Sequence, residues 1–72
     1  MTVPFEHPLA VGTAVHVKSE HFAEECEAVV SEAVYDEGWI YRVDVTDGDK
    51  PENATRKDGT VWLCDFEVHP LT

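Results

Sequence analysis

Basic side chains are scarce in this sequence, whose 72 residues include five Lys and Arg against fifteen Asp and Glu, a formal net charge of −10. Nucleic-acid binding depends on Lys and Arg that neutralise phosphates, so the composition argues against a nucleic-acid partner. An anionic membrane surface is disfavoured for the same reason. A basic protein partner would suit this charge, although excess acid more often serves only to keep a small domain soluble.

Long hydrophobic runs are also missing. The longest uncharged apolar stretches are a handful of residues, far below the roughly 18 that a membrane-spanning helix needs. The first ten residues, MTVPFEHPLA, lack the basic start and apolar run of a signal peptide. A cytoplasmic location is therefore the default expectation, and the glycosylation pattern at Asn53-Ala54-Thr55 is interpreted as accidental.

Cysteine is equally rare. Cys26 and Cys64 are too few for a disulfide framework, and neither belongs to a CxxC motif. We expect both thiols to be reduced and to act as small buried hydrophobic side chains. No pair of His or Cys has the spacing of a zinc finger or ribbon, so no metal site is expected. Separate solvated imidazoles are favoured, although His16 and His69 would become neighbours if the first and last strands pair.

The chain is too short for two domains. A chain of this size buries only about 60% of the surface that its unfolded form exposes, which leaves little room for a deep substrate pocket. No nucleophile motif, Gly-rich phosphate loop or haem motif is present. Asp47-Gly48-Asp49 is too short for a calcium loop. We therefore expect neither catalytic residues nor a cofactor, and the protein is not expected to be an enzyme.

Short runs of alternating polar and apolar residues indicate an all-β domain. An extended arm is expected over residues 1–10, anchored by Phe5 and Leu9, with the domain itself over residues 11–72. The expected strands cover residues 13–18, 26–35 with a bulge near Ser31, 39–45, 60–64 and 68–71. The alternation predicts that nine side chains form the core: Val15, Val17, Ala28, Val30, Tyr41, Val43, Val61, Leu63 and Val68.

The connections between these strands differ in kind. Residues 19–25 are acidic and are expected to form a loop or one helical turn. Asp36-Glu37-Gly38 predicts a tight turn. Thr46–Gly59 has no large apolar residue and is expected to be one long mobile loop, whereas residues 65–67 are expected to form a short 3₁₀ turn.

Five short strands with these connections resemble the SH3-like barrel family. The resemblance covers residues 11–71 and rests on Val11-Gly12 with Val15 and Val17, on Gly38-Trp39-Ile40-Tyr41-Arg42-Val43, and on Gly59-Thr60-Val61-Trp62-Leu63 followed by Val68 and Leu71. It is similar to the small bacterial barrels that serve as accessory proteins of larger complexes, such as those of photosystem I and of ferredoxin–thioredoxin reductase. It implies a five-stranded barrel with a 3₁₀ turn before the last strand. The ALYDY-like box is absent, so proline-rich peptide binding is not implied.

In SH3-like barrels the ligand groove commonly lies beside the loop after the first strand, which is acidic here. An aromatic floor rimmed by carboxylates would suit a Lys or Arg side chain of a partner. The candidate partner-binding residues are Glu20, Phe22, Glu24, Glu25, Tyr35, Trp39, Trp62 and Phe66. We expect them to gather at one barrel end, where residues 19–25 meet the Asp36–Gly38 turn. Trp39 is also in phase with the core, whereas Trp62 is expected outside.

These observations predict a non-catalytic protein-interaction module that binds a partner protein through an aromatic and acidic surface. The alternative is an accessory subunit that stabilises, or docks onto, a redox or metabolic enzyme complex. A small enzyme or metal carrier is a third class, which no motif in the chain favours.

Overall fold

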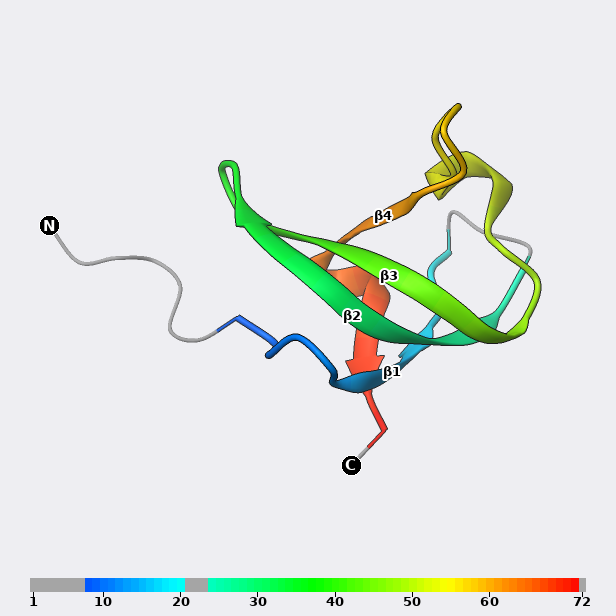
Figure 1. The fold of residues 1–72 in the computed structure, drawn as a ribbon, viewed down its shortest axis with the longest axis horizontal. Helices are drawn as coiled ribbons and strands as arrows, with labels where there is room; N and C mark the ends of the chain where they lie inside the picture. The colour runs from blue at the N-terminus through cyan, green and yellow to red at the C-terminus, as the bar shows by residue number, and fades with distance from the viewer. Residues whose placement is uncertain (1–7, 21–23, 72) are drawn as a thin grey trace, which may run out of the picture.

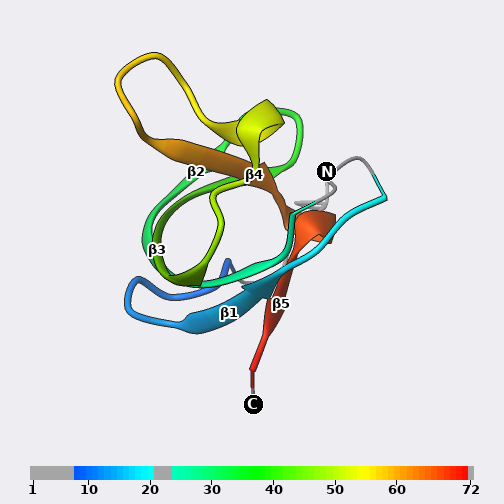
Figure 2. The same cartoon turned by 90° about the vertical axis from the view of Figure 1, so that its right-hand side faces the viewer.

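The computed structural model describes residues 8–20 and 24–71, which fold into five antiparallel strands in one sheet and two 3₁₀ turns. The strands are β1 (Ala14–Val17), β2 (Cys26–Tyr35), β3 (Trp39–Gly48), β4 (Val61–Cys64) and β5 (Val68–Pro70), and the turns are η1 (Glu52–Ala54) and η2 (Asp65–Glu67). The strand order is β4-β3-β2-β1-β5, so the sheet does not close and β4 and β5 form its edges. Figure 1 and Figure 2 show how the β2–β3 hairpin curves around the interior.

The predicted all-β architecture is confirmed, with small differences at the strand ends. β2 and η2 have the predicted bounds, and β1, β4 and β5 are one or two residues shorter than predicted. β3 instead runs three residues further, to Gly48. Within the described ranges no helix is long and apolar enough to cross a membrane.

The core lies on the concave face of the sheet, and all nine residues predicted for it are buried. Cys26 joins them at the start of β2. Val43 is buried while its neighbour Arg42 lies on the opposite face, so the predicted register of β3 is confirmed. Leu9, one of the two predicted anchors of the N-terminal arm, packs against the core, and its backbone N–H donates to the Tyr41 hydroxyl at 3.0 Å. Phe5 lies outside the described residues.

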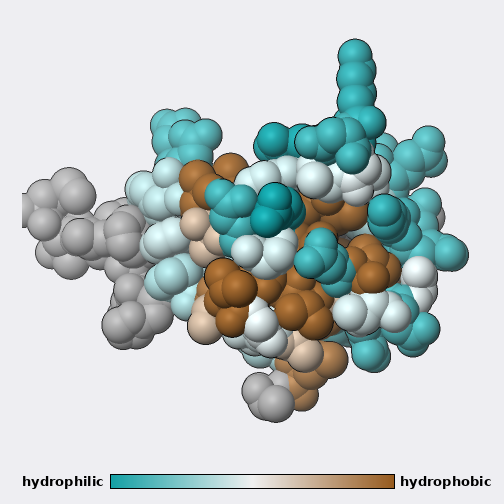
Figure 3. Space-filling model, in the orientation of Figure 1, coloured by the Kyte–Doolittle hydropathy of each residue, from teal (hydrophilic) through white to brown (hydrophobic). Residues whose placement is uncertain are grey.

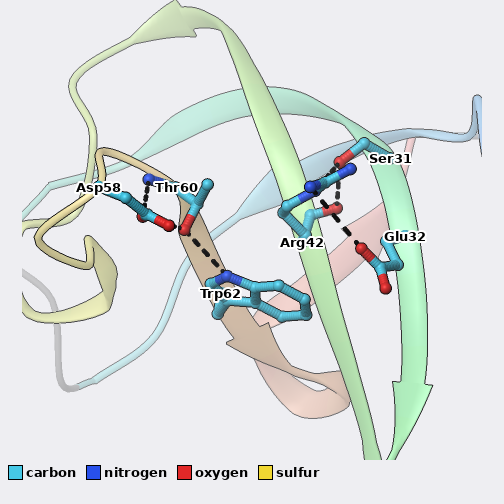
Figure 4. Close-up of polar contacts among 6 residues, drawn as sticks. All are labelled: Ser31, Glu32, Arg42, Asp58, Thr60 and Trp62. Carbon is cyan, nitrogen blue, oxygen red and sulfur yellow. Dashed lines mark hydrogen bonds and ion pairs between the residues drawn. The ribbon is translucent and has the colours of Figure 1, made fainter.

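The bulge predicted near Ser31 is confirmed. The register between β2 and β3 shifts between Val30 and Glu32, which leaves Ser31 as the extra residue. The Ser31 hydroxyl donates to the Arg42 carbonyl at 3.1 Å and accepts the Arg42 Nε–H at 3.0 Å (Figure 4). These bonds tie the bulge to the facing strand, and the shift explains why the alternation changes phase in the second half of β2.

The prediction of one long loop over Thr46–Gly59 is wrong. β3 continues through its first three residues to Gly48, and η1 follows. Thr55 then forms an isolated bridge with Val61. The segment also has an apolar anchor, because Pro51 is among the fully buried side chains. Proline is usually a signal for a turn, but its ring is apolar and here fills space beside the core.

The expectation that both cysteines are buried holds for Cys26 alone, since Cys64 is exposed. Cys64 ends edge strand β4 opposite Ile40, on the face turned away from the core. Both thiols are free in the structure. Cys26 pairs with Gly48 and Cys64 with Ile40, so the two cysteines lie at opposite ends of β3.

The thiols should therefore react very differently with a thiol reagent. Burial, with a smaller contribution from Asp49, raises the pKa of the Cys26 thiol, and burial together with Glu67 and Asp65 raises the pKa of the Cys64 thiol. Because a raised pKa leaves less thiolate at a given pH, we expect exposed Cys64 to react more slowly than a free thiol and to accelerate with rising pH. Peptide mapping of the labelled native protein should find the label at Cys64, with Cys64→Ser as the control. Fast labelling of native Cys26 would contradict its burial.

Candidate functional site

An open pocket of about 380 Å³ lies where the segment after β1 meets η2, and it is lined by Lys18, Ser19, Glu20 and Phe66. The two segments are fastened by the Lys18 backbone N–H, which donates to the Glu67 carbonyl at 3.1 Å. The Phe66 side chain is 59% exposed, the largest exposure of any aromatic residue in the described ranges. The structure thus brings together Glu20 and Phe66, two of the predicted site residues.

The chemistry of this pocket is mixed. Lys18 and Glu20 carry opposite charges, and the ring of Phe66 provides apolar surface between the two segments. An aromatic face with a nearby carboxylate can bind either an apolar side chain or the stem and head of a Lys or Arg. The pocket is therefore suited to a side chain of a partner protein.

The remaining acids of the 19–25 loop differ in their surroundings. Glu24 is half-buried and Glu25 is exposed. Glu25 Oε1 lies 3.1 Å from Nε2 of His16, so this carboxylate already has a partner within the chain. Phe22, the aromatic residue predicted within the same loop, lies outside the described residues.

Tyr35 and Trp39 lie far from this pocket, at the tip of the β2–β3 hairpin. Their rings pack edge to face, with centroids 5.5 Å apart and an interplanar angle of 71°. Tyr35 is 41% exposed and Trp39 is half-buried against the core. Trp39 thus has both of the roles considered for it, core and surface, because it packs against the core and also contacts Tyr35 at the hairpin tip.

The expectation that all candidate residues gather at one end is wrong. Residues 19–25 precede β2 and the Asp36–Gly38 turn follows it, and β2 has ten residues. At about 3.3 Å per residue, an extended strand of that length spans roughly 30 Å. Figure 1 shows the hairpin tip and the first residues of β2 at opposite ends of the sheet. The two loops that flank one strand necessarily lie at its two ends, and this geometric signal was available in the sequence.

Trp62 lies on the outer face of β4, as predicted, and is half-buried. Its Nε1–H donates to the Thr60 hydroxyl at 3.0 Å, and the Thr60 hydroxyl donates to Asp58 Oδ1 at 2.6 Å (Figure 4). The Thr60 backbone N–H also donates to Asp58 Oδ1, at 3.0 Å, and the hydroxyl and backbone bonds from Thr60 are the main reason that the pKa of the Asp58 carboxyl is lowered. The Arg56 guanidinium lies 4.6 Å above the indole centroid.

The surroundings of Trp62 make it a weaker site candidate than Phe66. A guanidinium above an indole is a favourable cation–π contact, and it covers surface that a partner would otherwise meet. The sequence offered one signal for this contact, because the hairpin that brings Arg56 beside Thr60 contains an Asp-Gly turn.

On the face drawn in Figure 3, apolar residues lie in separate groups between hydrophilic ones.

Possible metal ligands form no ready-made centre in the parts of the chain that the structure describes, since no three His, Cys, Asp or Glu side chains are grouped to hold an ion. The first and last strands do pair, however, and His16 lies directly opposite His69. His16 and His69 were expected to be neighbours if the first and last strands pair, and that condition is met.

Comparison with known proteins finds no matching family model, no matching curated protein and no matching solved structure. Function is therefore inferred from the chain's own residues.

Proposed function

We propose that this protein is a non-catalytic interaction module with an SH3-like barrel, which binds a partner protein at the pocket of Lys18, Ser19, Glu20 and Phe66. The observation that carries the proposal is Phe66, an aromatic side chain held 59% exposed beside an open pocket. A small domain gains stability from each aromatic residue that it buries, and exposed aromatic residues are enriched in protein interfaces.

Three features of the fold support an SH3-like barrel. The sheet has the order β4-β3-β2-β1-β5, so the first strand lies between the second and the last. A 3₁₀ turn, η2, stands directly before β5. The long β2–β3 hairpin curves over the core, as Figure 2 shows. The pocket beside the segment after β1 then occupies the region where this family commonly binds its ligands.

The charges favour a partner segment that combines an apolar side chain with Lys or Arg. Phe66 offers apolar and cation–π contacts, and Glu20 offers an ion pair. Lys18 balances the charge of Glu20 within the pocket, so apolar contact with Phe66 should supply most of the affinity. The net charge of −10 acts over a longer range and should mainly accelerate association with a basic partner.

Partner capture with paired baits tests this proposal. Wild-type protein and the Phe66→Ala variant are incubated with extract of the native host, and bound proteins are quantified by mass spectrometry. Loss of a buried aromatic anchor costs about 2 kcal/mol, so we expect roughly thirty-fold weaker binding of the specific partner by Phe66→Ala. Val11→Ala is the matched control, because Val11 is 68% exposed and lies outside the pocket.

Binding kinetics with the captured partner then separate the apolar contact of Phe66 from the charge of Glu20. Phe66→Ala should increase the dissociation rate, whereas Glu20→Gln should reduce the association rate at low salt and have little effect at high salt. Thermal melts of all three variants should match the wild type, because these side chains lie at the surface. Equal binding by wild type and Phe66→Ala, with normal melting, would place the binding site elsewhere.

A further inference from the structure

A row of four polar side chains crosses the outer face of the sheet from β5 to β3. His69 of β5 lies opposite His16 of β1, and His16 lies opposite Glu27 of β2. Glu27 in turn lies opposite Asp47 of β3. Residues that face each other across antiparallel strands project from the same side of the sheet, so these side chains are neighbours in pairs.

The two histidines occupy a hydrogen-bonded position of the β1–β5 ladder. The Lys18 N–H donates to the Glu67 carbonyl and the Leu71 N–H to the Ala14 carbonyl, each at 3.1 Å. Along an antiparallel ladder, hydrogen-bonded residue pairs alternate with non-hydrogen-bonded pairs. These two bonds belong to pairs two residues to either side of His16–His69, so His16–His69 is also a hydrogen-bonded pair, with Cα atoms about 5.5 Å apart. Imidazole nitrogens bind Zn²⁺ at about 2.0–2.1 Å, so one ion between the two rings is within reach of both.

The hydrogen bonds of the two rings fix which nitrogen is free. His16 Nε2 lies 3.1 Å from Glu25 Oε1, and His69 Nε2 lies 3.3 Å from the Lys18 carbonyl oxygen. A carboxylate and a carbonyl oxygen only accept hydrogen bonds, so Nε2 of each ring carries the proton. In the neutral rings Nδ1 is then left with its lone pair. Histidines that bind metals usually donate their other ring N–H to a carboxylate or a backbone carbonyl, and both of these do.

We propose that His16 and His69 bind one divalent transition-metal ion, such as Zn²⁺, Ni²⁺ or Cu²⁺, through their Nδ1 atoms. Imidazole is a suitable ligand for these ions, and the carboxylates of Glu25 and Glu27 beside His16 favour a cation. Water completes the coordination. The ion connects edge strand β5 to β1, so its binding stabilises the folded domain.

Titration of metal-free protein with Zn²⁺ alone tests this site. Isothermal titration calorimetry should give one ion per chain, with at least roughly ten-fold weaker binding for His16→Ala and for His69→Ala, as expected when one of two ligands is lost. The chain's other two histidines provide matched controls, and His7→Ala and His21→Ala should bind as the wild type does. Cu²⁺ should bind more tightly than Zn²⁺, as expected for nitrogen ligands.

Two further measurements keep the proposal open to refutation if a variant is unstable. Nitrogen NMR of the histidine rings should show that Zn²⁺ shifts Nδ1 of His16 and His69 while Nε2 keeps its proton. Zn²⁺ should raise the melting temperature of the wild type and leave that of His69→Gln unchanged. Wild-type affinity in His69→Ala, loss of binding in His7→Ala or His21→Ala, or metal at Nε2 would each overturn the proposal. None of these results depends on the partner-binding pocket.

Discussion

Replacing Gly48 with Ala should destabilise the domain by about 3–5 kcal/mol, from a strained backbone and a steric clash that add together. Gly48 has φ +90°, a conformation that residues with a Cβ rarely adopt. A Cβ at this position would lie 2.7 Å from the Glu25 carbonyl oxygen and 2.9 Å from the Cys26 Cα. Both are backbone atoms, so no side-chain rotation relieves the clash, and the end of β3 must move away from β2.

Gly59→Ala is the matched control for this prediction. Gly59 has φ +89°, and among the described residues nothing lies within 4 Å of a Cβ built there. Gly59→Ala should therefore lower the free energy of unfolding through backbone strain alone, by about 1–3 kcal/mol. Urea unfolding measures the free energy of unfolding of both variants. The extra loss in Gly48→Ala over Gly59→Ala is the cost of the steric clash with β2. Equal destabilisation by the two substitutions would contradict the register in which Gly48 faces Cys26.

Most of the fold follows from the alternation of side chains, and the exceptions have physical reasons. Period-2 patterns predicted the core because one face of each strand is buried, and the phase change at Ser31 predicted the bulge. The last part of β3, Thr46–Gly48, has no hydrophobic pattern that would predict a strand. Its extended shape comes from pairing with the long strand β2. The alternation in β4 that places Trp62 on the outer face also places Cys64 there, so the pattern indicated the exposure of Cys64, whereas composition alone suggested burial.

The candidate sites were predictable to different degrees. The proximity of Glu20 to Phe66 was expected from the family resemblance, which implies that the loop after the first strand and the 3₁₀ turn lie at the same end of an SH3-like barrel. The pairing of His16 with His69 followed from the strand order, once the first and last strands were taken as neighbours. The acceptors of the two Nε2 protons were not predictable, since one is a carbonyl whose direction depends on the backbone.

Leu63→Ala should destabilise the domain by about 2–5 kcal/mol, the usual range for a fully buried leucine. Leu63 is 1% exposed and faces Tyr41 from edge strand β4. Its removal loses apolar burial and leaves a cavity, because the neighbouring Val side chains are branched at Cβ and have little freedom to fill it. A domain of this size has a stability near the low end of about 5–15 kcal/mol, so this loss is a large fraction of the total.

Leu71→Ala makes the same chemical change at a side chain that is 49% exposed. It should alter the free energy of unfolding by no more than about 0.5–1 kcal/mol. Urea unfolding followed by tryptophan fluorescence compares the two, and the midpoint should fall sharply for Leu63→Ala while the slope stays unchanged. A similar loss in both variants would mean that β4 does not face the core through Val61 and Leu63. A reduced slope in Leu63→Ala would instead mean that the sheet loses its edge strand before the rest unfolds, because the native state would then expose less new surface on unfolding.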